Sequence, residues 1–103
     1  MSNGMDDRRK GFEGKWAHDA ELRFKVEARR NRALGLWVAG QKGLTGQAAE
    51  DMADSVIAAD FQEAGDADVF RKLRSELDVS VSDTAIRAKM TEELAAAVKA
   101  LTA

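Results

Sequence analysis

His18 and Glu21 form the first pair of residues whose types and spacing suggest chemistry, because both side chains can bind a metal ion. At a spacing of three residues they would share one face of a helix. A zinc or di-iron site in a helical bundle, however, needs three or more ligands from several helices. Since His18 is the only histidine and no serine or cysteine signature accompanies it, the sequence predicts no metal site and no catalytic role.

A group of carboxylates is the second candidate, for general acid and base catalysis. Its members are Glu50, Asp51, Asp54, Asp60, Glu63, Asp66 and Asp68. A catalytic carboxylate with a raised pKa needs apolar burial, whereas this spacing spreads the acids around the outer side of a helix. We interpret them as a solvated face, and we expect a protein that is not an enzyme.

The stretch GQKGLTG, residues 40–46, is the third candidate, because glycines before a helix can offer backbone N–H groups to a phosphate. It matches neither GxxxxGK[ST] nor GxGxxG, and no predicted strand precedes it. We therefore interpret it as a turn between two helices. Thr45 would accept a backbone N–H bond as the N-cap of the second helix.

Composition limits the fold and the class of partner. The 103 residues fit one domain, and 45% hydrophobic content without proline favours an all-α fold. The absence of cysteine removes disulfides and thiolate sites. Uncharged runs are far shorter than the roughly 20 apolar residues that cross a membrane, and no leader is recognisable, so we expect a cytoplasmic protein. A pI of about 5.4 argues against a nucleic-acid partner.

Charge is unevenly distributed along the chain. Residues 1–32 hold nine Lys or Arg and six Asp or Glu, a net charge of +3. Residues 43–70 hold seven acids and no base, a net charge of −7. This segregation predicts a basic helix packed beside an acidic one.

Apolar periodicity predicts four helices. The first runs from Trp16 to Gly40 and the second from about Gly46 to Ala64, with Gly65 after its end. Asp66 would cap a short third helix and Ser82 a fourth. The segment DVSVSD between them is interpreted as a loop rather than a strand, because it is short and lies between helical segments.

Each predicted helix is apolar along one side only. On the first, this side comprises Trp16, Ala20, Phe24, Ala28, Gly35 and Val38, flanked by Leu34 and Trp37. On the second, it comprises Ala49, Met52, Ala53, Val56, Ile57, Phe61 and Ala64. On the last two, it comprises Val69, Phe70, Leu73, Leu77, Ile86, Met90, Leu94, Ala97, Val98 and Leu101. Four such helices bury their apolar sides by packing together, so we predict a bundle-like single domain over residues 16–103.

The amino-terminal arm, residues 1–15, stands apart from this domain. It carries Phe12 four residues before Trp16, but Gly11 and Gly14 each cost a helix about 1 kcal/mol relative to alanine. We therefore predict a flexible arm in the free protein, with Phe12 partly exposed. A terminus that frays without any function is the alternative.

Long stretches of the sequence resemble one known family. FEGKWAHDAELRFKVEARRNRALGLWVA, ADFQEAGDADVFRKL and AIRAKM are similar to the ATPase inhibitor zeta subunit of alphaproteobacterial F-type ATP synthases. The resemblance implies a four-helix domain with a mobile inhibitory arm. The arm would fold into a helix at a catalytic interface of the synthase head and block rotation in the direction of hydrolysis. It also implies weak binding of ATP or ADP, with no required cofactor.

The resemblance places the partner-binding residues in the arm: Asp6, Asp7, Arg8, Arg9, Lys10, Phe12, Glu13, Lys15 and Trp16. The partner would be the catalytic head, with no nucleic acid and no direct membrane insertion. The protein would then be peripheral to the inner membrane through the synthase.

Three arm residues depart from the family pattern. Gly11 and Gly14 replace helix-favouring residues, and Arg9 stands where an acid is common. Together, the two glycines would lower the affinity of the arm for its partner about fivefold to thirtyfold. The alternative function is a small helical module that binds adenine nucleotides weakly and inhibits little or not at all.

Overall fold

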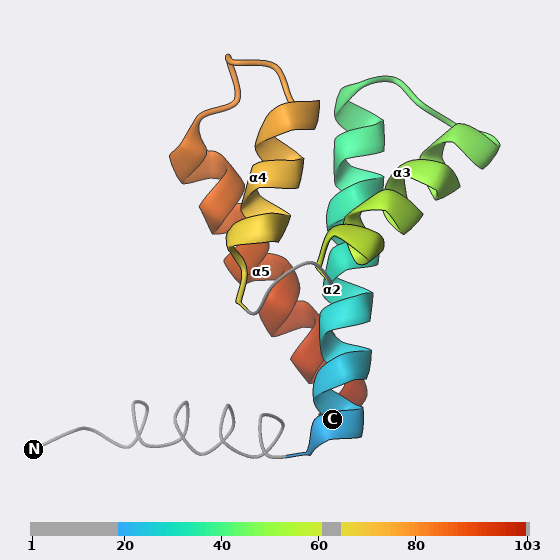
Figure 1. Ribbon diagram of the computed structural model, residues 1–103, viewed down its shortest axis with the longest axis vertical. Coiled ribbons are helices and arrows are strands. Elements are labelled where there is room, and N and C mark those ends of the chain that lie inside the picture. The colour runs from blue at the N-terminus through green and yellow to red at the C-terminus, as the bar shows by residue number, and fades with distance from the viewer. Residues whose placement is uncertain (1–18, 61–64, 103) are drawn as a thin grey trace, which may run out of the picture.

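A computed structural model of the chain describes residues 19–60 and 65–102. These residues form four helices: α2 (Ala20–Gln41), α3 (Gly46–Ala59), α4 (Ala67–Glu76) and α5 (Asp83–Thr102) (Figure 1). No strand occurs within the described ranges, so the all-α prediction is confirmed. The flexibility predicted for the arm and its boundary after Lys15 lie outside the described residues.

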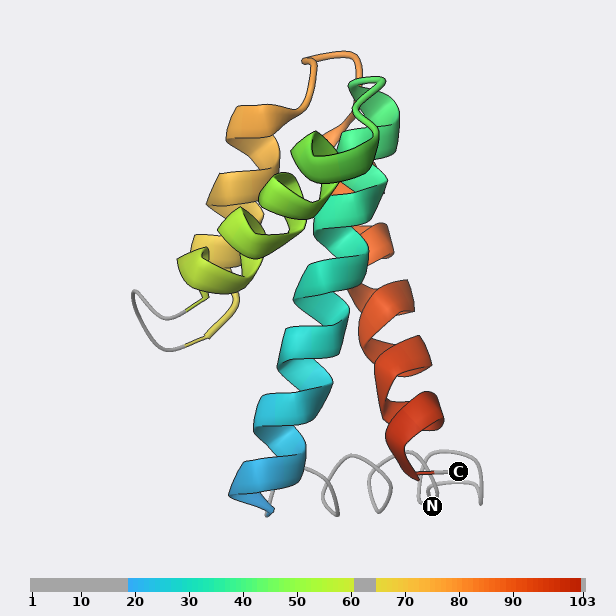
Figure 2. The same ribbon diagram turned by 90° about the vertical axis from the view of Figure 1, so that its right-hand side faces the viewer.

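The long helix α2 is the centre of the fold and contacts each of the other three helices. α3 crosses its carboxyl-terminal half, and α5 runs beside it so that the end of α5 lies near the start of α2 (Figures 1 and 2). α4 packs against α2, α3 and α5. The amino-terminal half of α2 therefore has α5 as its main neighbour, whereas the other half is enclosed.

Both ends of α2 have clear local causes. Asp19 has an extended backbone, and its Oδ1 accepts a 3.0 Å hydrogen bond from the Leu22 N–H. This cap starts the helix at Ala20, so the predicted start at Trp16 was wrong. At the other end Gly43 has φ +72°, a left-handed conformation that suits glycine, and the turn predicted for GQKGLTG is confirmed.

The other helix ends follow the predicted positions with three exceptions. The first is Asp66, which is the N-cap residue of α4 but makes no cap bond with its side chain. Ser82 Oγ accepts a 3.0 Å bond from the Ala85 N–H, and DVSVSD is a loop followed by the start of α5, as predicted. Thr45 is the N-cap residue of α3, but its side chain does not make the predicted cap bond. α3 ends at Ala59 with Asp60 as C-cap, which is earlier than the predicted end at Ala64. Gly65 has a positive φ of +89°, but because α3 ends at Ala59 it does not directly follow that helix, contrary to the prediction.

Two groups of buried apolar side chains form the core. The main cluster joins all four helices and comprises Leu34, Val38, Val56, Val69, Leu73, Leu77, Ile86 and Met90. The end cluster joins only the start of α2 and the end of α5, and comprises Val26, Ala97 and Val98 with Leu22 and Leu94 packed against them. The main cluster thus carries most of the hydrophobic stabilisation.

At Gly35 the backbones of α2 and α3 are in close contact. A Cβ atom built on Gly35 would lie 2.4 Å from the Ala53 Cα and 2.9 Å from its nitrogen. No side chain fits in that space, so glycine is required for steric reasons and not for conformational freedom. The crossing also explains why the second half of α2 is so thoroughly covered.

The predicted apolar side of α2 is correct in one half of the helix and wrong in the other. Leu34, Gly35 and Val38 are buried as predicted, but Ala20 is exposed and 55% of Phe24 is exposed. Helix α3 has 14 residues against 22 in α2, about 21 Å against 33 Å, so it does not cover the first turns. On the opposite side of these first turns, α5 packs against Val26 of α2.

Candidate functional site

All nine predicted partner-binding residues fall within positions 6–16, outside the described residues. His18, Phe61 and Glu63 also lie outside them. The structure does describe the segment that directly follows the arm, which is the first half of α2. The candidate site is therefore built from the start of α2 and the charged groups behind it.

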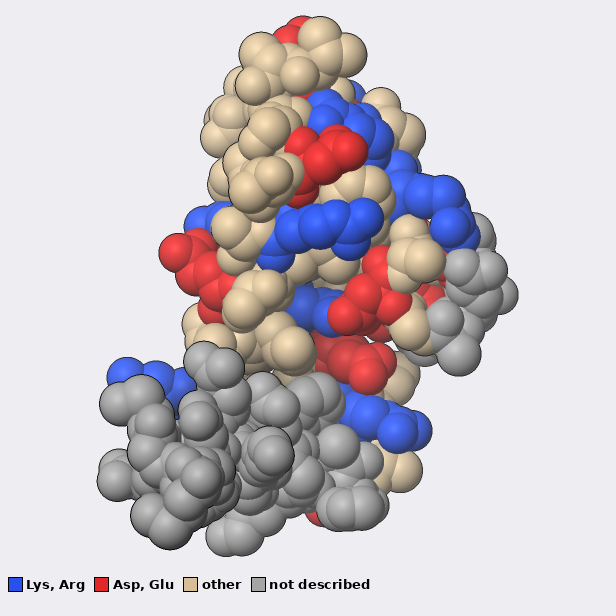
Figure 3. Space-filling view, turned by 90° about the vertical axis from the view of Figure 1, so that its left-hand side faces the viewer, with Lys and Arg blue, Asp and Glu red and all other residues tan. Residues whose placement is uncertain are grey.

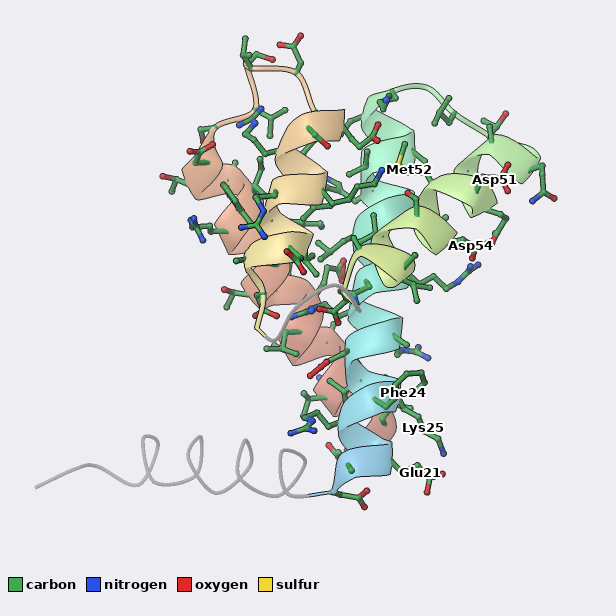
Figure 4. The ribbon with its side chains drawn as sticks, viewed as in Figure 1. Glu21, Phe24, Lys25, Asp51, Met52 and Asp54 are labelled. Atoms are coloured by element: carbon green, nitrogen blue, oxygen red, sulfur yellow. The ribbon has the colours of Figure 1, made fainter. Side chains whose placement is uncertain are left out.

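The exposed side of this segment holds a polar pair and an apolar strip. Lys25 Nζ lies 3.1 Å from Glu21 Oε1, an ion pair at the four-residue spacing that brings side chains of a helix together, and both side chains are exposed. Phe24 lies between them in sequence, and Figure 4 shows all three side chains on the side of α2 where α3 lies. We call Ala20, Phe24 and Ala28 the entry face.

A small hollow of about 60 Å³ adjoins the entry face where α3 ends. Its lining residues come from α2 and from the end of α3: Phe24, Glu27, Ala28, Asn31, Ile57 and Asp60. Burial raises the pKa of Glu27, and the nearby negative charge of Asp60 raises it further. The hollow is thus apolar on one side and carries two carboxylates on the other.

Arg30 lies behind this hollow and organises the charged groups of the fold. Only 2% of Arg30 is exposed. Its Nε donates to Asn31 Oδ1 at 3.0 Å, and its Nη1 donates to Asp66 Oδ1 at 2.9 Å. Its Nη2 lies 3.7 Å from Asp60 Oδ2, which also accepts a 2.9 Å bond from Asn31 Nδ2. Arg30 and Asn31 therefore hold α2 to the end of α3 and the start of α4.

This network corrects the interpretation of the acidic group as a solvated face. Asp51 and Asp54 are exposed as predicted, but Asp60 is largely covered and Asp68 is only 6% exposed. Asp68 pairs with Arg71 in the same helix. Buried carboxylates are retained where a cation or hydrogen-bond donor compensates them.

The predicted pairing of a basic with an acidic helix is confirmed. Beyond the Arg30 network, the two terminal nitrogens of Arg32 donate to the two carboxylate oxygens of Glu50, at 2.6 and 3.0 Å. These hydrogen bonds lower the pKa of Glu50. Figure 3 shows Lys and Arg side chains next to Asp and Glu side chains on the described part of that face, not gathered by sign.

Sequence reasoning missed Arg30 and Asn31 because it relied on side-chain type. Their positions did carry a signal, since Arg30 lies four residues before Leu34 and eight before Val38, both of which are buried. A helix places residues at this spacing on nearly the same face. The register of the buried side therefore pointed to Arg30, while its charge pointed away from it.

A second hollow, of about 270 Å³, lies on the other side of Arg30. It is lined by Arg30, Asp66, Arg87, Met90, Thr91 and Leu94. The Arg87 guanidinium also lies 3.9 Å from the centre of the Phe70 ring. A hollow lined by two guanidinium groups and by Met90 and Leu94 can attract an anion that has an apolar part, although Arg30 is already paired with Asp66.

The described ranges 19–60 and 65–102 bring together no group of three or more His, Cys, Asp or Glu side chains that could hold a metal. Within the same ranges, no helix has the length and apolar character needed to cross a membrane.

Comparison with known proteins adds the identity of the family. The family model described as ATPase inhibitor subunit zeta matches residues 1–100, so it includes the arm as well as the four helices. A protein solved by solution NMR has 44% sequence identity and a TM-score of 0.72, and the match covers 78% of this chain and 94% of that one. Comparison with curated proteins found no match.

Proposed function

Because the chain belongs to the ATPase inhibitor subunit zeta family, we propose that it inhibits ATP hydrolysis by inserting its arm at a catalytic interface of the F-type ATP synthase head. The family by itself makes the protein an ATPase inhibitor in general terms, with the ATP synthase as its partner. The observation that carries the finer proposal is that the match begins at residue 1, so it takes in every proposed partner-binding residue.

The arm and the domain would have different tasks. Phe12 and Trp16 are four residues apart in the sequence and would be the apolar anchors once the arm is helical. The charged residues of the arm would contact the walls of the site: Asp6, Asp7, Arg8, Arg9, Lys10, Glu13 and Lys15. Ordering the arm costs free energy at the moment of binding, which keeps an inhibitor displaceable. The domain, held together by the Arg30 network and the main cluster, would keep the arm at the head.

The proposed partner also determines the place of the protein in the cell. Bound to the head, it would lie on the cytoplasmic side of the inner membrane and be peripheral to it. The described helices offer no membrane-spanning segment that would require another arrangement.

The decisive experiment measures ATP hydrolysis by the cognate synthase head with the full-length protein and with a version lacking residues 1–15. We expect inhibition by the full-length protein and none by the shortened one. Thermal unfolding of both should give similar midpoints, because the clusters of the core lie within residues 19–102. Equal inhibition by the shortened version would contradict a working arm.

The glycines of the arm provide a graded test. Replacing Gly11 and Gly14 with alanine should strengthen inhibition about fivefold to thirtyfold, because each alanine favours the bound helix by roughly 0.5 to 1 kcal/mol. Gly40→Ala is the matched control, since it makes the same change in a helix, with no atom within 4 Å of the new Cβ. Unchanged or weaker inhibition by the arm variant would contradict helix formation there.

The second candidate function is weak binding of adenine nucleotides, and the hollow between Arg30 and Arg87 favours it. Its guanidinium groups suit a phosphate, and Met90 and Leu94 offer apolar surface to a base. Amide shifts recorded during an ATP titration should change saturably around Arg87 and Thr91. Absence of any shift at about millimolar ATP would remove this candidate.

A further inference from the structure

Arg87 of α5 differs from most of the described basic side chains, which pair with a carboxylate of this chain. Arg74, for example, lies 3.0 Å from the carboxylate of Asp83. Arg87 is exposed and has no carboxylate partner in the part of the chain that the structure describes. Its guanidinium instead lies 3.9 Å from the centre of the Phe70 ring of α4. This contact holds the cation in place and leaves its charge uncompensated.

The hollow of about 270 Å³ between α2 and α5 lies beside this cation. We call it the Arg87 hollow, and its lining residues are Arg30, Asp66, Arg87, Met90, Thr91 and Leu94. Arg30 is only 2% exposed, and it already donates to Asn31 and Asp66. Arg87 is therefore the guanidinium in this lining that can pair with a ligand.

The charges of the Arg87 hollow suit a single carboxylate better than a phosphate chain. The side chain of Asp66 is 57% exposed, and its negative charge is compensated by Arg30. Arg87 then leaves one positive charge for a ligand. A guanidinium and a carboxylate match through two parallel hydrogen bonds, whereas a nucleotide would bring several negative charges close to Asp66. Met90 and Leu94 offer apolar surface to the carbon atoms that carry the carboxylate.

From the uncompensated charge of Arg87 and the hollow beside it, we propose that Arg87 pairs with an Asp or Glu side chain on the surface of the synthase head. This inference rests on the proposed function, because its partner is the head that receives the arm. One such pair is too weak to hold a free carboxylate. On the head, the carboxylate would already be held close to Arg87 by the bound arm.

The position of the hollow on α2 allows one partner to contact both the hollow and the arm. Arg30 follows the first residue of α2, Ala20, by ten residues, which is about 15 Å of helix. The arm precedes the same end of α2 in the sequence. The hollow therefore lies within reach of a large protein surface that the arm enters.

The test measures binding of the full-length protein to the synthase head, together with inhibition of ATP hydrolysis. Arg87→Gln should raise the Kd about tenfold, because the carboxylate of the head loses its counter charge. Arg87→Lys keeps the charge but loses the two parallel hydrogen bonds, so it should recover only part of the binding. A role of Arg87 in the fold alone would lower the thermal unfolding midpoint of Arg87→Gln and leave its binding unchanged, which would overturn the inference.

Thr91→Glu tests the hollow while leaving Arg87 and Phe70 in place. Thr91 is exposed, lines the hollow and follows Arg87 by four residues, so a glutamate there would pair with Arg87 within α5. This internal carboxylate should compete with the head and also raise the Kd about tenfold. Since the new pair lies within one helix, the unfolding midpoint should stay the same or rise slightly.

Lys99→Gln is the matched control, because it also removes one exposed positive charge from α5, twelve residues beyond Arg87 and outside the lining of the hollow. It should leave binding unchanged. If the wild type inhibits while Arg87→Gln and Thr91→Glu bind as tightly as it does, the inference is overturned and the proposed function stands. If the wild type binds without inhibiting, the proposed function fails, while weaker binding by both variants still supports the pair. A wild type that does not bind the head overturns both.

A nucleotide in the same hollow would give a different result. ATP would then cause saturable amide shifts around Thr91 in the free protein, and Arg87→Gln would remove these shifts without changing the Kd for the head. That outcome would overturn the inference and assign the Arg87 hollow to a phosphate ligand.

Discussion

The two halves of α2 have different surroundings, since one belongs to the main cluster and the other to the end cluster. The carboxyl-terminal half is enclosed by three helices, meets α3 at Gly35 and contributes Leu34 and Val38 to the main cluster. The amino-terminal half packs mainly on α5, through the small residues Ala97 and Val98, and leaves Phe24 exposed. One helix thus serves as a core element at one end and as a presented surface at the end nearest the arm.

Charged contacts show the same contrast. In the carboxyl-terminal half, Lys42 lies 2.8 Å from Glu76 of α4, and Arg32 pairs with Glu50 of α3, so these pairs connect helices. In the amino-terminal half, the Glu21 and Lys25 pair stays within one helix and is exposed. Such a pair stabilises a helix by only about 0.3 to 0.5 kcal/mol. Glu21 and Lys25 are therefore available to a partner at little cost to the fold, whereas Arg30 at the end of this half is buried and connects α2 to Asp60 and Asp66.

The largest effect on this contrast is expected from Gly35→Ala. The new Cβ would meet backbone atoms of Ala53, which cannot move aside as a flexible side chain would, so α2 and α3 must separate. We expect a loss of about 3 kcal/mol in unfolding free energy, or a midpoint lower by about 12 °C or more. Thermal unfolding followed by circular dichroism measures it.

Gly40→Ala is the control for this substitution. It makes the same chemical change five residues further along α2, where nothing lies within 4 Å of the new Cβ. It should raise stability by up to about 1 kcal/mol. Similar destabilisation by both variants would mean that the close contact at Gly35 does not determine how the second half of α2 packs against α3.

A matched pair of valines measures the difference between the two halves directly. Val38 in the main cluster and Val26 in the end cluster are both fully buried in α2. Val38→Ala should cost about 2 to 3 kcal/mol, whereas Val26→Ala should cost about 1 kcal/mol, because two helices can close a cavity more easily than four. Denaturant unfolding gives both values, and equal costs would show that the end cluster is as rigid as the main one.

The smallest effect is expected from Glu27→Gln, and its size depends on pH. Burial and Asp60 raise the pKa of Glu27, so the ionised side chain destabilises the fold. Stability is therefore gained as the pH falls through the raised pKa, where the native state takes up a proton first. Glu27→Gln should raise the unfolding midpoint slightly at pH 7, and the difference should vanish below about pH 4.3.

Glu76→Gln provides the opposite sign in the enclosed half. Hydrogen bonds from Lys42 and Lys72 lower the pKa of Glu76, so its contribution is present above the unfolded-state pKa and is lost as the pH falls through the lowered value. This variant should be less stable than the wild type at pH 7. The same sign for Glu27→Gln and Glu76→Gln would contradict the electrostatic difference between the two halves.

Much of the fold was predictable because it depends on local signals. Ser82 begins a helix wherever its hydroxyl can accept a nearby N–H, and the glycines after α2 end that helix in any context. The seven-acid run beside a basic segment likewise predicted that α2 and α3 would pair. The end of α3 was predicted too late, because apolar periodicity continues through residues that follow the helix.

The candidate site was less predictable, since it depends on where neighbouring helices stop. Phe24 and Leu34 were both assigned to the apolar side of the first predicted helix, but only Leu34 is buried in the main cluster, whereas Phe24 lies beside the end of α3 and is 55% exposed. Arg30 and Asp60 have side chains of a type that usually lies on the surface, but both are largely covered. Arg30 lies near Asp60, and Asp60 also accepts a hydrogen bond from Asn31. The pattern of apolar and polar residues along one helix contains no information about the length and position of another helix.

By itself, the sequence determined that the chain is helical, where its turns lie and which family it belongs to, because capping, glycine conformation and sequence similarity act locally or by inheritance. Only the tertiary structure decided which half of α2 is enclosed. The physical reason is that burial requires a second surface, and α3 is too short to supply one for the turns that follow the arm.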